Sequence, residues 1–250
     1  RRDPPSSLID TERHLEYGAY DRIYPTDIPV PEPLFLENST DFLEQPFSIM
    51  AAIENPMSDV APLSSEQKQE IGKQKYNLLG SLAAKDPLAL KFDEIMPVPD
   101  VAATAKEQLA YWQGVINDDE IHPQPIAQAA IRWLGENLPP PAQKISIVHG
   151  DYRTGNFLFN DQTQITAILD WEMAALGNPL QDLAWFNHMD ATFSEGLGAP
   201  RLEGLPNYEQ TKAQWESVSG FAARDYDYYL IFAGMRFGLL LSRIMLATDQ

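Results

Sequence analysis

The sequence predicts an α+β fold in which a few short strands are set into a mostly helical chain. Apolar residues recur at four-residue spacing over residues 11–24, which is typical of an amphipathic helix. Two β-rich runs follow, at 34–36 and 47–50, around a polar turn predicted at 37–40. A second group of β-rich runs lies between residues 145 and 169. Two strand clusters separated by a long helical region therefore define the fold class.

Most of the remaining chain is predicted to be helical. Residues 65–138 follow a helical pattern with proline-rich interruptions at 96–99 and 122–125, because proline removes a backbone donor and ends a helix. Asn178 is predicted as the N-cap of a later helix, with Pro179 at its first helical position. Each of these signals concerns a boundary between helices.

The most apolar stretch, residues 229–247, contains Arg236 and Arg243 well inside it. A membrane span needs about 20 mostly apolar residues, and charged side chains at its centre are costly. We therefore predict a packed C-terminal helix and no membrane association.

Composition excludes several other classes of protein. The 250 residues include 36 acidic and 18 basic side chains, which gives a formal net charge of −18. Such a charge repels phosphate backbones and anionic lipid, so we expect no binding to nucleic acid. The absence of cysteine excludes disulfides and thiolate metal sites, and we expect a cytoplasmic location.

A predicted hairpin brings two oxygen-bearing side chains together. If its turn is centred between Gln162 and Thr163, Asn156 faces Leu169, one residue before Asp170. Adjacent strands lie about 4.8 Å apart, so both side chains can share one cation at the open end of the hairpin. Their oxygens suit a hard ion such as Mg²⁺, which takes few protein ligands beside phosphates and water.

The loop that enters this hairpin carries candidates for catalysis. Asp151 precedes Asn156 by five residues, and its carboxylate can accept a proton from an attacking hydroxyl. Arg153 can neutralise charge on a transferred phosphoryl group. A catalytic Asp, a metal-binding Asn and a second metal-binding Asp after a short hairpin form the template of phosphoryl transfer. His149 by itself is interpreted as a structural residue that shapes the loop.

These residues also carry a family resemblance. The motif His149-x-Asp151-x4-Asn156 is followed by Ile-Leu-Asp-Trp-Glu at 168–172 and by Gly-Asn-Pro-Leu-Gln-Asp-Leu-Ala at 177–184. This series resembles the aminoglycoside phosphotransferase and choline kinase-like family, which are small-molecule relatives of the protein kinases.

The resemblance implies a role for each matched residue. Asp151 would be the catalytic aspartate, Asn156 and Asp170 would hold Mg²⁺, and Arg153 matches the catalytic-loop lysine of protein kinases. Asp182 would brace the catalytic loop from a helix. The reaction implied is transfer of the γ-phosphoryl group of ATP to a hydroxyl of a small molecule, such as an aminoglycoside, a choline-like compound or a sugar.

A weaker resemblance covers the N-terminal part. Glu16 would pair with the phosphate-contacting basic residue of the small lobe, a position that Arg1 or Arg2 would fill. Residues Met50, Ala51 and Ala52 would border the adenine. The implied fold is protein kinase-like and two-lobed. An incomplete β lobe with the hinge would occupy residues 1–54, and a helical lobe would occupy residues 55–250.

Some family features are missing from the printed sequence. The glycine-rich phosphate loop and the first two strands are not found in it, and we expect the numbered chain to begin after a missing segment. Two other functions stay open at this point. One is a catalytically silent nucleotide-binding module of the same fold, and the other is a metal-dependent phosphohydrolase.

Overall fold

The computed structural model describes residues 13–118, 124–198 and 205–248. Helix α1, Arg13–Ile23, buries the face that carries Glu16, Ala19, Tyr20 and Ile23, as its four-residue spacing predicts. Arg1 and Arg2 lie outside the described residues, so their predicted role has no structural counterpart here.

Strands β1, Pro33–Glu37, and β2, Phe47–Met50, form an antiparallel pair in which Glu37 faces Phe47. The predicted turn at 37–40 is wrong, because Glu37 belongs to the strand and the connection runs over 38–46. Two local turns make this longer loop: the Glu37 side chain accepts a hydrogen bond from Ser39 N, and Glu44 adopts a positive φ of 62°.

Three helices fill the predicted helical region, and the proline-rich segments separate them. They are α2 at Ser65–Ala84, α3 at Thr104–Asp118 and α4 at Pro125–Glu136. Helix α2 begins with a capping box, in which Ser64 and Gln67 each bond the other's backbone N–H. It packs against α6, Tyr208–Ser219.

Four short strands form two separate pairs in the centre of the molecule. Strand β3, Ser146–Val148, pairs with β6, Ala175–Gly177, and β4, Phe157–Phe159, pairs with β5, Ile165–Ile168. Single 3₁₀ or π turns complete the connections, at Phe92–Glu94, Thr154–Asn156, Trp171–Met173 and Thr192–Gly196. The pairing of β6 was not predicted, because a three-residue strand carries almost no periodicity.

The helix after β6, α5 at Leu180–Ala191, begins one residue later than predicted. Pro179 is its N-cap rather than its first helical residue. The Asn178 side chain nevertheless caps the helix, since its Oδ1 accepts a hydrogen bond of 3.0 Å from Leu180 N. Gly177, the residue before Asn178, belongs to β6.

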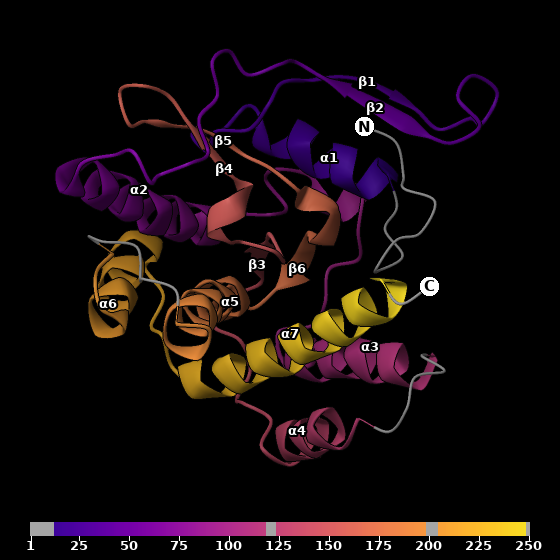
Figure 1. Ribbon diagram of the computed structural model, residues 1–250. Coiled ribbons are helices and arrows are strands. Elements are labelled where there is room, and N and C mark those ends of the chain that lie inside the picture. The colour runs from indigo at the N-terminus through magenta and orange to yellow at the C-terminus, as the bar shows by residue number, and fades with distance from the viewer. Residues whose placement is uncertain (1–12, 119–123, 199–204, 249–250) are drawn as a thin grey trace.

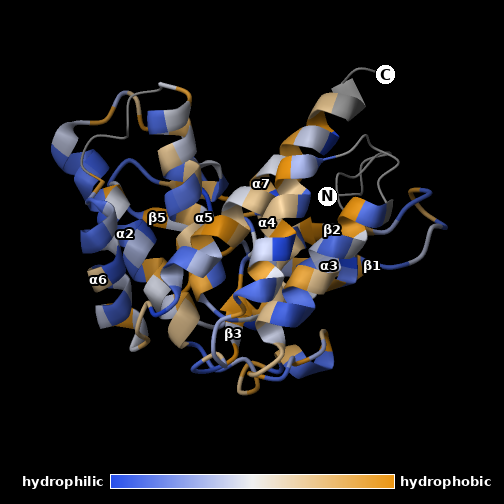
Figure 2. Ribbon diagram, turned by 90° about the horizontal axis from the view of Figure 1, so that it is seen from below, coloured by the Kyte–Doolittle hydropathy of each residue, from blue (hydrophilic) through white to orange (hydrophobic). Residues whose placement is uncertain are grey.

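The last helix, α7, spans Tyr226–Thr248 and confirms the predicted C-terminal helix. By length and composition alone it is also apolar enough to cross a membrane over Tyr226–Met245. In Figure 2, hydrophobic residues of α7, coloured orange, occur along most of the helix. Within the fold α7 packs against α5 and α4, and Arg236 at its centre is buried. This burial is typical of a core helix.

In Figure 1, the β1–β2 hairpin lies above the four central strands, α1 lies between this hairpin and strands β3 and β6, and α3, α4, α5 and α7 lie below the strands. Two backbone contacts join the upper part to the central strands: Pro29 O accepts from Ile168 N at 2.8 Å, and Met57 bridges Phe159. The chain passes between them through Asn55, which has a positive φ of 45°. The β4–β5 hairpin is therefore one of the places at which the N-terminal part contacts the rest of the chain.

Candidate active site

The loop that follows β3 is held by a buried carboxylate. Asp182, in the first turn of α5, accepts hydrogen bonds from the backbone N–H groups of His149 and Gly150, at 2.6 and 2.9 Å. Burial raises the pKa of Asp182, and these two donors and the nearby His149 and Arg236 act in the opposite direction. Asp182 thus joins the start of α5 to the loop, where the resemblance placed it.

The His149 ring connects the same loop to the second arm of the hairpin. Its Nε2 lies 2.9 Å from Leu169 O, and its Nδ1 accepts a hydrogen bond of 3.2 Å from Asp151 N. Burial lowers the pKa of His149, so the ring is neutral and carries its proton on Nε2. The ring therefore sets the spacing between Asp151 and Asp170 through backbone contacts alone.

The Asp151 carboxylate accepts three hydrogen bonds from nitrogen donors. Trp185 Nε1 donates to Oδ1 at 3.0 Å, Arg153 Nε donates to Oδ2 at 2.8 Å, and Asn156 Nδ2 donates to Oδ2 at 3.0 Å. The Asp151 side chain is 16% exposed, so part of it still faces solvent. A carboxylate fixed in this way is oriented but accessible to a ligand.

Asn156 and Asp170 lie at the open end of the hairpin, as the sequence arithmetic predicts. Phe157 faces Ile168, and Leu169 N donates to Asn156 O at 2.8 Å. The register then shifts by one residue at Phe159, closer to the turn.

These two residues have the donor set that a magnesium ion prefers. The Nδ2 group of Asn156 is held by the backbone oxygen and the carboxylate of Asp151, which leaves Oδ1 to coordinate a cation. Asp170 has a positive φ of 69°, and its N–H donates to the Tyr20 hydroxyl at 2.9 Å. Among the described residues, no group of three or more His, Asp or Glu side chains is arranged to hold a metal ion by itself. The amide and carboxylate pair therefore fits Mg²⁺ with phosphate oxygens as further ligands.

The predicted nucleotide-binding residues are spread over two elements. Glu16 is buried on α1 and forms an ion pair with Arg13 one turn earlier. Met50 ends β2, and Ala51 N donates to Glu32 O at 2.8 Å. Ala52 follows in an exposed position. Contact of these four residues with a nucleotide stays a prediction.

Three residues at the site were missed from the sequence. Trp185 bonds Asp151, Arg236 Nη2 donates to Gly150 O at 2.8 Å, and Tyr20 receives the Asp170 N–H. The sequence carried a signal for two of them. Trp185 follows Asp182 by three residues and Tyr20 follows Glu16 by four, so each lies on the same helix face as a residue already predicted for the site. Arg236, one of two arginines in the apolar helix α7, had no comparable signal.

A cavity of about 600 Å³ opens beside the loop, and Gly150 and Arg236 line it. Its walls are mainly apolar side chains from α1, α3, β6 and the connecting segments: Leu15, Met96, Val98, Trp112, Met173 and Leu176. Three carboxylates also line it, from Asp100, Glu107 and Glu172. Apolar walls with a few polar groups are typical of small-molecule sites.

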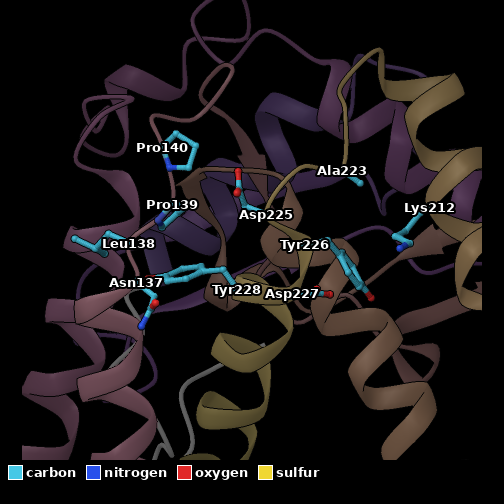
Figure 3. Close-up of a pocket in the computed structure, with 10 residues that line it drawn as sticks. All are labelled: Asn137, Leu138, Pro139, Pro140, Lys212, Ala223, Asp225, Tyr226, Asp227 and Tyr228. Carbon is cyan, nitrogen blue, oxygen red and sulfur yellow. The ribbon is translucent and has the colours of Figure 1, made fainter.

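A second cavity, of about 440 Å³, lies between the end of α4 and the start of α7 (Figure 3). Its lining includes Asn137, Lys212 and Tyr228, and none of the predicted site residues is among the side chains that surround it. The cavity beside Gly150 is therefore the one associated with the candidate site.

The fold and the motif residues together define a kinase-like phosphotransferase fold. A family model described as the phosphotransferase enzyme family matches residues 1–220, and the chain belongs to this family. The predicted α+β two-lobed, kinase-like fold is thereby confirmed, as is the resemblance to aminoglycoside phosphotransferases and choline kinases.

Curated relatives include acyl-CoA dehydrogenase family member 11 of Homo sapiens, 24% identical over 82% of this chain and 28% of that protein. Acyl-CoA dehydrogenase family member 10 of Mus musculus is 25% identical over 98% of this chain and 24% of that protein. The chain thus spans only about a quarter of the length of these relatives.

Solved structures show the same fold at low identity. A candidate aminoglycoside phosphotransferase from Ralstonia eutropha superimposes with a TM-score of 0.77 and 22% identity, over 93% of this chain and 73% of that one. A choline/ethanolamine kinase family protein from Mesorhizobium loti gives 0.56 and 17%, over 95% and 73%. An aminoglycoside phosphotransferase solved with GDP and kanamycin gives 0.60 and 14%, over 94% and 82%.

Proposed function

We propose that this chain transfers the γ-phosphoryl group of ATP to a hydroxyl group of a small molecule. In this reaction the acceptor oxygen bonds to the γ-phosphorus, the bond to the β–γ bridging oxygen breaks, and ADP leaves. The Asp151 carboxylate orients the acceptor hydroxyl and receives its proton.

The observation that carries this proposal is the arrangement around Asp151. Its carboxylate is fixed by Trp185, Arg153 and Asn156 and stays partly exposed at the mouth of the hairpin. Holding a reactive group in one orientation lowers the entropic cost of the chemical step. Because Asn156 touches both the carboxylate and the predicted metal position, the acceptor and the phosphate are brought to adjacent places.

A Mg²⁺ ion held by Asn156 Oδ1 and Asp170 would supply charge neutralisation on the phosphate oxygens. Arg153 adds a positive charge of this chain's own, since it lies against Asp151 and its side chain is 40% exposed. We propose the cavity beside Gly150 as the site of the acceptor. The GDP-bound phosphotransferase structure supports nucleotide binding by this fold.

The test is ATP consumption in the presence of Mg²⁺ across a panel of amino alcohols, sugars, aminoglycosides and uncharged alcohols. With an acceptor found, Asp151→Asn should lower kcat by about 10²- to 10⁴-fold. This variant keeps the size of the side chain and its contact with Trp185. Unchanged turnover in Asp151→Asn would refute the assignment.

The two alternatives give different results in the same assay. A catalytically silent module binds nucleotide but consumes none with any acceptor. A phosphohydrolase releases inorganic phosphate at full rate without an acceptor, whereas a kinase shows only slow background hydrolysis. Phosphorylated acceptor, identified by its mass, separates the proposed function from both.

A further inference from the structure

We propose that Trp185 and Arg236 are positioning residues for Asp151, and that they leave one lone pair of Asp151 Oδ1 as the binding point of the acceptor hydroxyl. This inference rests on the proposed phosphoryl transfer, which supplies the hydroxyl. Neither residue belongs to the sequence motif of the catalytic loop; each comes from a helix that packs beneath it.

The hydrogen bonds of the carboxylate indicate where the acceptor binds. An ionised carboxylate offers about four lone-pair positions, two on each oxygen. Oδ2 already accepts from Arg153 and from Asn156. Oδ1 accepts from Trp185 Nε1, at 3.0 Å. Among the described residues one position therefore stays open, and it lies on the same oxygen that the indole holds.

Arg236 fixes both the indole and the backbone next to Asp151. Its Cζ lies 4.7 Å from the centre of the Trp185 ring, and its Nη2 donates to Gly150 O at 2.8 Å. The same Cζ lies 5.1 Å from the centre of the Trp112 ring. Helices α5 and α7, which lie side by side in Figure 1, thus hold the carboxylate through one side chain each.

The guanidinium is suited to this role because it is both planar and buried. Arg236 is 4% exposed, and a cation over an aromatic face is attracted more strongly when water is excluded. Burial lowers the pKa of Arg236 to about 10, so the side chain remains charged near neutral pH. Rotation of the Trp185 ring would lose this stacking, so the indole N–H stays directed at Oδ1.

The first test is Trp185→Phe, which removes the N–H donor and keeps an aromatic face for Arg236. We expect kcat to fall by about 10- to 100-fold, the effect of losing a hydrogen bond to a charged group, with the KM for ATP unchanged. A purely structural role would instead lower the amount of folded protein and leave the kcat of the folded fraction intact. A kcat within about 2-fold of the wild type would overturn the proposal.

Trp215→Phe is the matched control. Trp215 is fully buried on α6, and its Nε1 makes no hydrogen bond to any residue that the structure describes. The substitution therefore loses the same atoms from a core position without removing a donor–acceptor pair. Its thermal unfolding should shift no more than that of Trp185→Phe, because no hydrogen bond is lost, and its kcat should stay at the wild-type value.

The second test combines Trp185→Phe with Arg236→Met, which replaces the buried cation by an apolar side chain. If Arg236 acts through the indole and the Gly150 carbonyl, the two kcat losses overlap. The double variant then loses less than the product of the single losses. Losses that multiply would overturn the part assigned to Arg236.

A third measurement does not depend on turnover. The five tryptophans give five indole N–H signals in a nitrogen-15 correlation spectrum. We expect Asp151→Asn to move the Trp185 signal, because its acceptor loses the negative charge, and to leave the Trp215 signal in place. An unmoved Trp185 signal would refute the contact itself. If the wild-type chain phosphorylates no acceptor and Asp151→Asn still moves the Trp185 signal, the result would count against the proposed function alone.

Discussion

The sharpest structural prediction concerns Gly150, between His149 and Asp151. Its φ is +85°, a region that glycine adopts readily and other residues avoid. A Cβ atom added there would lie 2.2 Å from Met173 O and 2.7 Å from Met173 Cβ. The closer of these neighbours is backbone, so no side-chain rotation can relieve the contact. Gly150→Ala must therefore move the loop or the turn after Asp170.

Two contributions set the size of the effect. A left-handed backbone costs a residue with a Cβ about 1–2 kcal/mol. Forcing extra volume into a packed region costs roughly a further 1–3 kcal/mol. The sum, about 2–5 kcal/mol, corresponds to a fall in Tm of roughly 4–20 °C for a chain of this length. Because Gly150 also bonds Asp182 and Arg236, its displacement moves the neighbouring Asp151. We expect kcat to fall by up to about 100-fold.

Gly220→Ala is the control that isolates the first contribution. Gly220 has a φ of +75°, but a Cβ there would meet nothing within 4 Å. It should lower Tm by roughly 2–8 °C and leave turnover unchanged. Thermal unfolding of both variants, followed by initial rates at saturating ATP, completes the measurement. If Tm falls no further in Gly150→Ala than in Gly220→Ala, the contact with Met173 adds no measurable cost and the reasoning is refuted.

Three further perturbations test other parts of the fold. Burial lowers the pKa of His149, so its contribution to stability is present above its ordinary pKa of 6.5 and is lost as pH falls below that value. Tm should therefore fall less between about pH 7 and pH 5 in His149→Gln than in the wild type; an equal fall would contradict the neutral ring. Burial also lowers the pKa of Lys75, to about 8, because its ammonium lies in the core over the Phe157 ring. Lys75→Met should raise the free energy of unfolding by about 1–3 kcal/mol in urea titrations at neutral pH, and a lower value would show that the cation is well compensated. Tyr20→Phe removes the hydroxyl that accepts the Asp170 N–H, and we expect about 5-fold more Mg²⁺ to be needed for half-maximal ATP consumption; an unchanged Mg²⁺ titration would separate Tyr20 from the metal position.

Local patterns were sufficient to predict much of the site. The turn between Gln162 and Thr163 fixes the pairing of its two arms near the open end, so Asn156 and Asp170 are placed together by chain geometry alone. Asp182 and Asn178 were also accessible from the sequence, since acidic and capping residues collect at helix N-termini. In each case the signal is local, because a hairpin turn or a helix start specifies the position of the residue before any long-range contact forms.

The ends of strands were less well predicted from the sequence where contacts with distant residues determine them. Strand β6 exists because β3 lies beside it, and three residues carry no period of their own. The β1–β2 connection is longer than a tight turn because side-chain bonds and a left-handed residue shape it locally. In both cases the backbone groups found partners that the sequence pattern does not specify.

The sequence by itself determined the loop at 149–156, the hairpin that places Asn156 near Asp170, and the helical character of most of the chain. Only the tertiary structure decided how the Asp151 carboxylate is held. Trp185 and Arg236 lie 34 and 85 residues from Asp151 along the chain. Trp185 bonds the carboxylate directly, whereas Arg236 contacts the Trp185 ring and Gly150 O because α5 packs against α7. Packing between helices depends on the shape and volume of whole faces, which no short motif records.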